Sequence, residues 1–188
     1  NALLSRINTS YESENYMVSR DASESFIARF PDDEQIDEIR LKLLASYVYS
    51  SRYKMASAYA DRLLQGSLLS EVYYEDIEYY QIVMSIEKSK HIYGKLFKIG
   101  NIYRNFSELD ITMTQIDAFL DKYPNSAYTD DLLGIKSEIR TVIAEYHLNI
   151  ALHYAKKGNK EAAQQRLEIY YDRYSDVKTP LLDKVLSY

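Results

Sequence analysis

Two amphipathic runs follow each other almost without a loop in the segment AEYHLNIALHYAKKGNKEAAQQRLEIYYDRYSD, residues 144–176. The first belongs to a longer run in which apolar residues recur at steps of three and four from Ile135 to Tyr154, the spacing of one face of an α-helix. After Gly158 the same spacing resumes and continues to Tyr174. So short a connection joins only antiparallel helices. The sequence therefore predicts a helical hairpin with a tight glycine turn.

The first helix of this hairpin carries its own start and stop signals. Thr129 can cap its first turn, two aspartates follow at the positive end of the helix dipole, and two lysines precede the terminating Gly158. A helix between Tyr128 and Gly158 would hold about 29 residues and measure roughly 43 Å at about 1.5 Å per residue. Such a helix is too long for most small bundles.

The same pattern of two amphipathic helices separated by a short break occurs earlier in the chain. Residues 37–49 form an amphipathic run, the letters SSRY interrupt it, and a second face follows through Ala56 and Leu63. Residues 1–31 suggest another pair, with a break near 9–14. The letters RFPDD, KYPNS and RYSDV mark recurring exits, where an aromatic residue ends a helix and polar residues cap the next.

Helix pairs that repeat at about 34 residues are typical of tetratricopeptide repeats. We therefore expect an all-α fold, a right-handed superhelix of about four helix-turn-helix repeats plus the start of a fifth. The whole chain, 1–188, is expected to form one elongated repeat domain. Its repeats would cover residues 1–31, 32–67, 70–124, 126–175 and, as a partial copy, 177–188.

The third repeat is expected to carry an insertion. The letters HIYGKLFKIGNIYRNFSELD, residues 91–110, interrupt the helical pattern with Gly94 and Gly100. Helices are predicted before and after this segment, at about 72–90 and about 110–122. Near the other end of the chain, Pro180 fits the first turn of a last helix.

Composition narrows the class of function. Five glycines and three prolines against twenty tyrosines suit a nearly all-helical chain. The net charge of −5 argues against nucleic acid as a partner, because phosphate binding needs a basic face. There is no cysteine for disulfides or thiol catalysis, and no apolar run approaches the roughly 18 residues of a membrane-spanning helix. The first residues lack the pattern of a signal peptide and an initiator methionine, so we expect the targeting information to lie elsewhere.

Catalytic patterns are weak. His147 and His153 are six residues apart and do not share a helix face as a metal pair would, and His91 is isolated. The letters EVYYEDIEYY, residues 71–80, are better explained by an acidic surface over buried tyrosines than by a metal site. We expect no catalytic residue, no metal and no cofactor. The competing hypothesis is a helical hydrolase or metal protein that uses His147, Glu145 or His153.

Two kinds of residue bear on binding. Tyr47, Tyr146, Tyr154 and Tyr174 fall on core faces, whereas the doublets 73–74, 79–80 and 170–171 cannot bury both members, because neighbours lie about 100° apart on a helix. Exposed tyrosine is enriched at binding surfaces.

Arg166 lies at the border of a buried face, next to Leu167. It can form a structural salt bridge, for instance to Asp131 or Glu145. Alternatively, its planar guanidinium can form an ion pair with a partner protein. The sequence leaves both possibilities open.

From Tyr123 onward the sequence resembles the BamD family of outer-membrane assembly lipoproteins. The likeness is carried by the letters YPNSAY at the entry, the combination of AEY with HYAKKG in the long helix, the following helix with its alanines and Arg166, and the aromatic exit. Residues 1–66 match the family only in repeat layout. The exit RYSD has serine where the family usually has proline, and the family's lipid-bearing cysteine is absent.

This resemblance implies a periplasmic scaffold, held by an N-terminal lipid to the inner leaflet of the outer membrane, that performs no covalent chemistry. Its C-terminal repeats would dock the periplasmic domain of BamA through Arg166, with Tyr170 and Arg173 beside it. The N-terminal repeats would receive unfolded outer-membrane β-barrel proteins or another lipoprotein of the machinery. The candidate groove residues for these clients are Tyr49, Tyr53, Tyr74 and Tyr80. The alternative is another tetratricopeptide adaptor or chaperone, for secretion, cell division or cell-envelope assembly.

Overall fold

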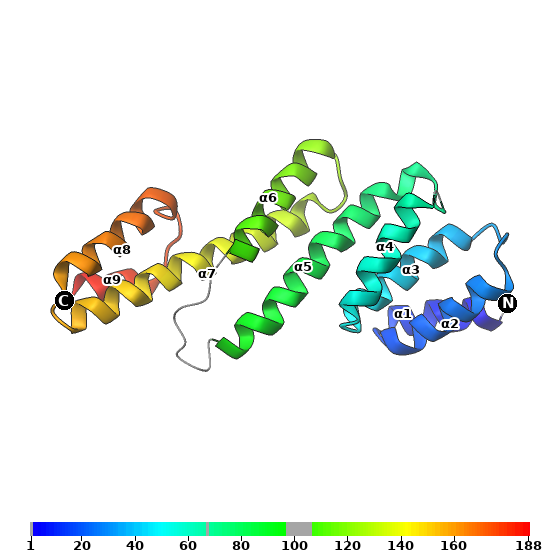
Figure 1. Ribbon diagram of the computed structural model, residues 1–188, viewed down its shortest axis with the longest axis horizontal. Coiled ribbons are helices and arrows are strands. Elements are labelled where there is room, and N and C mark those ends of the chain that lie inside the picture. Colours follow the sequence, from blue (N-terminus) through cyan, green and yellow to red (C-terminus); the bar gives the residue numbers. More distant parts are fainter. Residues whose placement is uncertain (1, 67, 97–106) are drawn as a thin grey trace. The chain divides into compact units, whose positions relative to one another are not determined.

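The computed structural model describes residues 2–66, 68–96 and 107–188, and throughout these ranges the regular structure is helical. The expected all-α, tetratricopeptide-like fold is thereby confirmed. The chain divides into two compact units, Asn1–Tyr93 and Gly94–Tyr188, whose helices are labelled in Figure 1. Within the described helices, none combines the length and the apolar character that a bilayer crossing requires.

The first unit is built from helical hairpins. Its helices are α1 (Ala2–Glu12), α2 (Tyr16–Arg29), α3 (Ile36–Tyr49), α4 (Tyr53–Gln65), the short 3-10 turn η1 (Glu71–Tyr73) and most of α5 (Tyr74–Leu96). Glu14 (φ 58°) and Ser51 (φ 60°) adopt the left-handed conformation that closes the turns after α1 and α3. Both turns fall where the sequence predicts breaks.

The core of the first two hairpins is apolar but contains small polar residues. Ile7, Phe26 and Ile39 are buried together. Between α2 and α3, Ser46 Oγ donates a hydrogen bond to Ser19 Oγ over 3.2 Å, and both serines are fully buried. Small side chains at these positions let the two helix backbones approach closely.

The second unit is organised around one long helix. Its helices are α6 (Ser107–Lys122), α7 (Thr129–Lys156), α8 (Lys160–Arg173) and α9 (Pro180–Leu186), and α7 packs against each of the other three. Among its fully buried side chains are Ile116, Leu132, Leu148 and Tyr170. The 28 residues of α7 agree with the length expected from the sequence.

The predicted glycine turn joins α7 and α8. Gly158 has φ 76°, and the N–H of Asn159 donates to the carbonyl of Tyr154 over 3.0 Å, which closes the end of α7. The Asn159 side chain then caps α8 by accepting from the N–H of Ala162 over 3.1 Å. Pro180 occupies the first turn of α9, as expected, behind the capping Thr179.

Two local predictions were wrong. Thr129 does not cap α7, since it is already helical and its Oγ1 is buried without a hydrogen-bond partner in the described part of the chain. Ser126 Oγ instead accepts the N–H of Tyr128 over 3.0 Å. The second is the break at Gly94, because α5 continues through this residue to Leu96 before α6 begins at Ser107. A single helical glycine costs only about 1 kcal/mol, which its neighbours outweigh. Whether residues 91–110 are an insertion stays a prediction. Residues 97–106, with Gly100, lie outside the described ranges.

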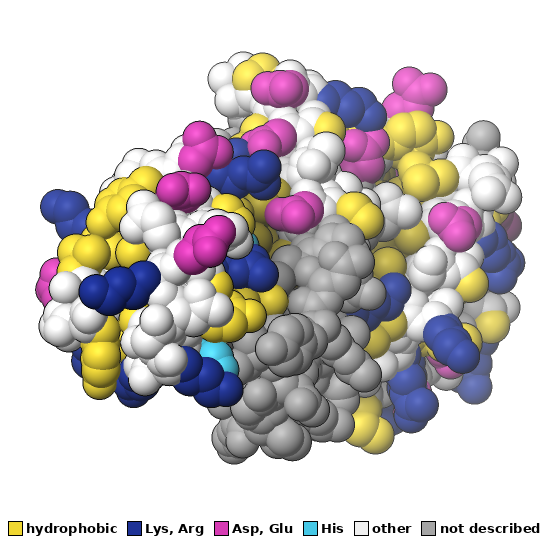
Figure 2. Space-filling view, turned by 60° about the vertical axis from the view of Figure 1, so that its left-hand side comes forward, with side chains coloured by type: hydrophobic (Ala, Val, Ile, Leu, Met, Phe, Trp, Pro, Cys, Tyr) yellow, Lys and Arg dark blue, Asp and Glu magenta, His cyan; other side chains and the backbone are white. Residues whose placement is uncertain are grey.

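The helix pairs α1–α2, α3–α4 and α7–α8 fall within the residue ranges of three expected repeats, whose boundaries stay predictions. A single elongated domain and the handedness of a superhelix stay predictions. Large apolar side chains reach the surface at isolated places, such as Met17 and Val72, and Figure 2 shows apolar side chains lying between charged ones of both signs on one face. Scattered exposure of this kind does not by itself mark a docking surface.

Candidate partner-binding surfaces

Arg166 lies half-buried on α8 without the salt bridge that the sequence allowed. Glu145, one expected partner, accepts a hydrogen bond from Thr179 Oγ1 over 3.0 Å instead. Within the described part of the chain, no ion pair involves the guanidinium of Arg166. A half-buried cation without an internal counter-charge remains available to an acidic group from outside.

His147 of α7 has the buried nitrogen and the altered pKa that often mark functional histidines. Its Nδ1 is buried without a hydrogen-bond partner among the described residues, and its ring stacks on Tyr174 with centroids 6.1 Å apart. Burial lowers the pKa of His147, and the positive charges of Arg166 and Arg173 lower it further, against a weaker opposing effect of Asp110. The local field is therefore positive.

Arg173 ends α8 with an exposed side chain. Its Nε lies 3.8 Å from a carboxylate oxygen of the adjacent Asp172, a weak surface contact. The backbone of Arg173 is better fixed, because its carbonyl accepts from Arg140 Nη2 over 3.1 Å. The same Arg140 pairs with Asp176 over 2.6 Å and lies over the ring of Tyr174. This network ties the exit of α8 to α7.

Tyr170 differs from the other two residues of the expected docking site. It is only 2% exposed, and its hydroxyl donates to the carbonyl of Val177 over 2.7 Å. Its neighbour Tyr171 is 46% exposed, which agrees with the expectation that a tyrosine doublet cannot be wholly buried. Tyr170 thus anchors the segment between α8 and α9 and presents almost no side-chain surface to a partner.

Two of the four tyrosines expected to line a client groove are in contact. Tyr49 and Tyr80 meet, with ring centroids 6.4 Å apart, and Tyr16 stacks on Tyr49. Tyr53 donates its hydroxyl to Ser51, and Tyr74 lies half-buried at the start of α5. Tyr16, Tyr49 and Tyr80 therefore form an aromatic cluster, and a groove that it shares with Tyr53 and Tyr74 stays a prediction.

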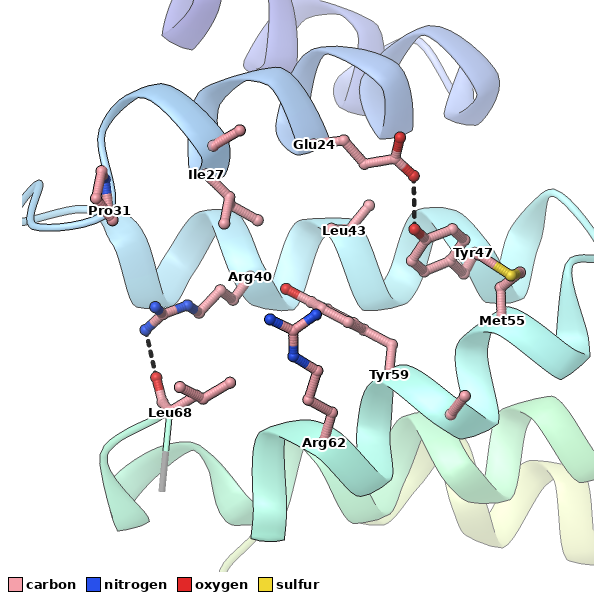
Figure 3. A pocket seen from close by; sticks show the side chains of 12 residues that line it. Glu24, Ile27, Pro31, Arg40, Leu43, Tyr47, Met55, Tyr59, Arg62 and Leu68 are labelled. Carbon is pink, nitrogen blue, oxygen red and sulfur yellow. Dashed lines mark hydrogen bonds between the residues drawn. The ribbon is translucent and has the colours of Figure 1, made fainter. Parts of the chain in front are cut away.

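A hollow of about 580 Å³ lies elsewhere in the first unit, between α2, α3 and α4. None of the four expected tyrosines lines it. Its lining is mainly apolar and includes Ile27, Leu43 and Met55 (Figure 3). The one signal that could have indicated it is the presence of Arg40 and Arg62 among apolar periodic residues, but the hollow forms only where three helices meet.

One end of the hollow carries positive charge. Arg40 Nη1 contacts Asp37 over 3.1 Å and also donates to the carbonyl of Leu68, which holds the segment after α4 against α3. The Tyr59 hydroxyl lies between the side chains of Arg40 and Arg62 (Figure 3). Burial raises the pKa of Tyr59 to about 12, against a lowering by the two arginines, so its hydroxyl stays a neutral donor.

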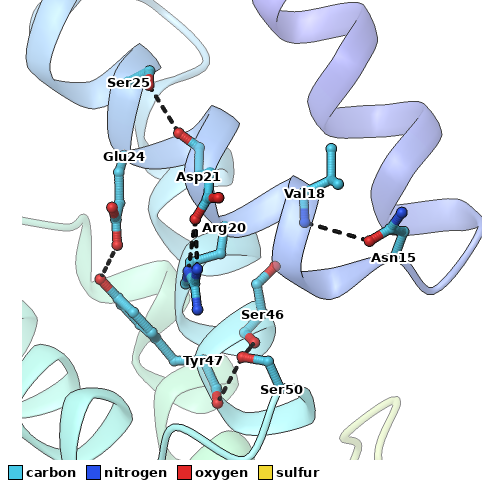
Figure 4. Close-up of polar contacts among 9 residues, drawn as sticks. All are labelled: Asn15, Val18, Arg20, Asp21, Glu24, Ser25, Ser46, Tyr47 and Ser50. Atoms are coloured by element: carbon cyan, nitrogen blue, oxygen red, sulfur yellow. Dashed lines mark hydrogen bonds and ion pairs between the residues drawn. The ribbon is translucent and has the colours of Figure 1, made fainter.

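At the other end of the hollow, the polar side chains bind each other. The Tyr47 hydroxyl donates to Glu24 Oε1 over 2.5 Å (Figure 4). Burial, with the adjacent Glu24, raises the pKa of Tyr47, so the Tyr47 hydroxyl stays a neutral donor. Nearby, Arg20 is bound to Asp21 over 2.6 Å and does not enter the lining.

The residues of the catalytic hypothesis do not converge. His147 stacks on Tyr174, Glu145 binds Thr179, and the exposed His153 lies with its ring beside that of Tyr154. The side chain of His91 lies outside the described residues. Within the described ranges, no three histidine or acidic side chains are grouped so that they could hold a metal ion.

The fold and its surfaces define an all-helical repeat protein whose notable features are contact surfaces. The family comparison agrees, because a family model described as "YfiO: Outer membrane lipoprotein" matches residues 1–185. The chain belongs to this family of outer membrane lipoproteins, and the family and the location at the outer membrane expected from the sequence are both confirmed.

Curated relatives share the name outer membrane protein assembly factor BamD. The one from Pasteurella multocida is 23% identical over 154 residues, 80% of this chain and 58% of the relative. The one from Vibrio cholerae is 20% identical over 176 residues, 94% of this chain and 73% of the relative. A third, from Xylella fastidiosa, is 28% identical over 80 residues, 43% of this chain and 27% of the relative. The chain thus spans well under two thirds of the Pasteurella relative's length.

Proposed function

We propose that this protein is a non-enzymatic scaffold for outer-membrane protein assembly that docks the periplasmic domain of BamA through the surface around Arg166. The observation that carries the proposal is the half-buried Arg166, which has no ion pair within the described residues and acts electrostatically on the half-buried His147. A partner that brings a carboxylate to Arg166 supplies the missing counter-charge.

The surrounding residues support this role for the surface. Arg173 adds a second positive charge on an exposed side chain, and the exposed Tyr171 offers an aromatic contact next to it. Buried Tyr170 and the Arg140–Asp176 pair hold the exit of α8 in place. A docking surface on such a rigid base loses little conformational entropy when a partner binds.

The second part of the proposal concerns clients. Unfolded barrel proteins, or a companion lipoprotein, would bind the first unit, where the aromatic cluster of Tyr16, Tyr49 and Tyr80 reaches the surface. A scaffold that holds a client and the insertion machinery at once raises the effective concentration of one for the other. Such a function needs no catalytic group. The names of the relatives support an assembly role.

The test is binding of the full chain to the purified periplasmic region of its cognate BamA, measured by surface plasmon resonance. Arg166→Glu places a negative charge against the partner's carboxylate, so we expect affinity to fall by about a hundredfold or more. Arg166→Lys keeps the charge but loses the planar fork, and should weaken binding less.

The matched control is Arg52→Glu, a charge reversal at an exposed arginine of the first unit. It should leave the affinity within about twofold, since an isolated surface charge contributes little. Equal binding by wild type and Arg166→Glu, with unchanged helicity, would remove Arg166 from the proposal. Absence of binding by the wild type would overturn the docking function itself.

A further inference from the structure

Hydrogen-bond donors outnumber acceptors at the positive end of the hollow in the first unit. The Arg62 guanidinium has no hydrogen bond or ion pair within the described part of the chain, and the Tyr59 hydroxyl has no acceptor there. Arg40 uses Nη1 for Asp37 and Leu68 and keeps its other N–H groups. Donors that converge in this way without an acceptor favour an anion.

The carboxylate that also lines the hollow does not neutralise these donors. Glu24 accepts the Tyr47 hydroxyl over 2.5 Å at the opposite end, as Figures 3 and 4 show. Glu24 is thus already bound by Tyr47, whose ring centroid lies 5.7 Å from that of Tyr59, and its charge is the weakest of the influences on the Tyr59 hydroxyl. The charge of Glu24 also disfavours a ligand that is negative along its whole length.

The rest of the lining fits hydrocarbon. Ile27, Leu43 and Met55 form apolar walls, and Met55 is 54% exposed although it faces the hollow. Among the described residues that line it there is no Asn, Gln, Ser, Thr, Lys or His. A peptide chain buried here would leave backbone N–H and C=O groups without partners, which is unfavourable. A hydrocarbon chain carries no such groups.

We propose that this hollow binds a fatty acid, with the carboxylate between Arg62, Arg40 and Tyr59 and the hydrocarbon chain along the walls formed by Ile27, Leu43 and Met55. The volume of about 580 Å³ lies within the range of roughly 300–1,000 Å³ that is common for sites of single small ligands. The lipids of the outer membrane are a source of such a ligand for a protein of this family.

The test is calorimetric titration of the full chain with decanoate, kept below its micellar concentration. Decyltrimethylammonium, which has the same chain and the opposite charge, and acetate, which has no chain, serve as ligand controls. We expect decanoate to bind at one site and the two controls to bind at least about tenfold more weakly, because the site needs both the anion and the chain.

Two variants examine the assigned contacts. Arg62→Gln removes a charged donor and should weaken decanoate binding about tenfold, and Tyr59→Phe should weaken it by about threefold to tenfold. The matched control is Arg52→Gln, an exposed arginine outside the lining, which should have no effect. Circular dichroism verifies that each variant keeps its helicity.

Three results would overturn the proposal. Equal affinity for decanoate and decyltrimethylammonium would mean that the arginines do not select an anion. Unchanged binding in Arg62→Gln would place the ligand elsewhere. If a short peptide with a free carboxylate bound in an Arg62-dependent manner and decanoate did not, the occupant would be a peptide. None of these results depends on docking to BamA, so they test the ligand of the hollow separately from the proposed docking function.

Discussion

At the scale of single residues, His147 couples the candidate docking surface to pH. Its ring is held between Tyr174 and the positive charges of Arg166 and Arg173, with a buried Nδ1 that has no partner in the described part of the chain. The burial and the two arginine charges favour the neutral imidazole, because a protonated ring would be partly buried beside two cations. Asp110 is the group that opposes this effect.

The expected consequence is acid sensitivity of the second unit. The pKa of His147 lies below its ordinary value of 6.5 in the folded chain, so the unfolded chain takes up the proton first as the pH falls. The contribution of neutral His147 to the free energy of unfolding is therefore fully present above pH 6.5. It declines as the pH drops toward the lower, folded-state pKa. Urea unfolding of wild type and His147→Phe at about pH 8 and about pH 5.5 measures this contribution.

The wild type should lose more stability between the two pH values than His147→Phe, which keeps an aromatic ring against Tyr174 but cannot be protonated. His153→Phe is the control, since that histidine is exposed on the same helix. An identical pH dependence in wild type and His147→Phe would show that the proton on His147 does not affect folding.

At the scale of elements, two glycines in and after α7 differ in the backbone conformation that their positions require. A Cβ at either Gly134 or Gly158 would meet nothing within 4 Å, so space does not distinguish them. Gly134 is an ordinary residue inside α7, whereas Gly158 has φ 76° in the turn to α8. The difference between the two positions is therefore purely one of backbone conformation.

Alanine should consequently act in opposite directions at the two positions. Gly134→Ala should stabilise the chain by about 0.5–1 kcal/mol, since alanine loses less backbone entropy in a helix. Gly158→Ala should destabilise it by about 1–2 kcal/mol, the cost of a left-handed conformation for a residue with a Cβ. Urea unfolding of the two variants is the measurement. A stabilising effect of Gly158→Ala would contradict the turn geometry.

The same helices illustrate which features a sequence can predict. Gly158 and Pro180 were predicted correctly because their roles follow from their own backbone preferences. The start of α7 was not, because the path of the chain before the helix places Tyr128 at the cap position and leaves Thr129 inside the helix. The hollow was missed because Arg40 and Tyr59 meet only through the packing of α3 against α4.

For the expected binding residues too, the sequence predicts the position on the helix but not the contacts. The border position of Arg166 follows from helical periodicity, but its lack of an ion pair within the described residues depends on where Glu145 finds another partner. Tyr170 shows the limit most clearly. Periodicity indicates that one member of the 170–171 doublet is buried, but only the bond from its hydroxyl to Val177 shows that Tyr170 serves as an anchor.

At the scale of the whole molecule, the two proposed activities belong to different compact units. The surface around Arg166 lies in Gly94–Tyr188, and the hollow with Arg62 lies in Asn1–Tyr93. Each unit has its own buried residues, for example Ile39 in the first and Leu148 in the second. Substitutions at separate sites without shared partners are usually additive, to within about 0.5 kcal/mol.

We therefore expect the two sites to be energetically independent. Arg166→Glu should lower the affinity for BamA by about a hundredfold or more but leave the decanoate affinity within about twofold. Arg62→Gln should lower the decanoate affinity about tenfold and leave docking unchanged. The measurement is a cycle in which both ligands are titrated against wild type, each variant and the double variant. Loss of docking in Arg62→Gln, or stronger docking when decanoate is bound, would mean that the ligand of the hollow regulates the docking surface. Coupling of this kind is reciprocal, so decanoate would then also bind more tightly to the complex with BamA than to the free protein.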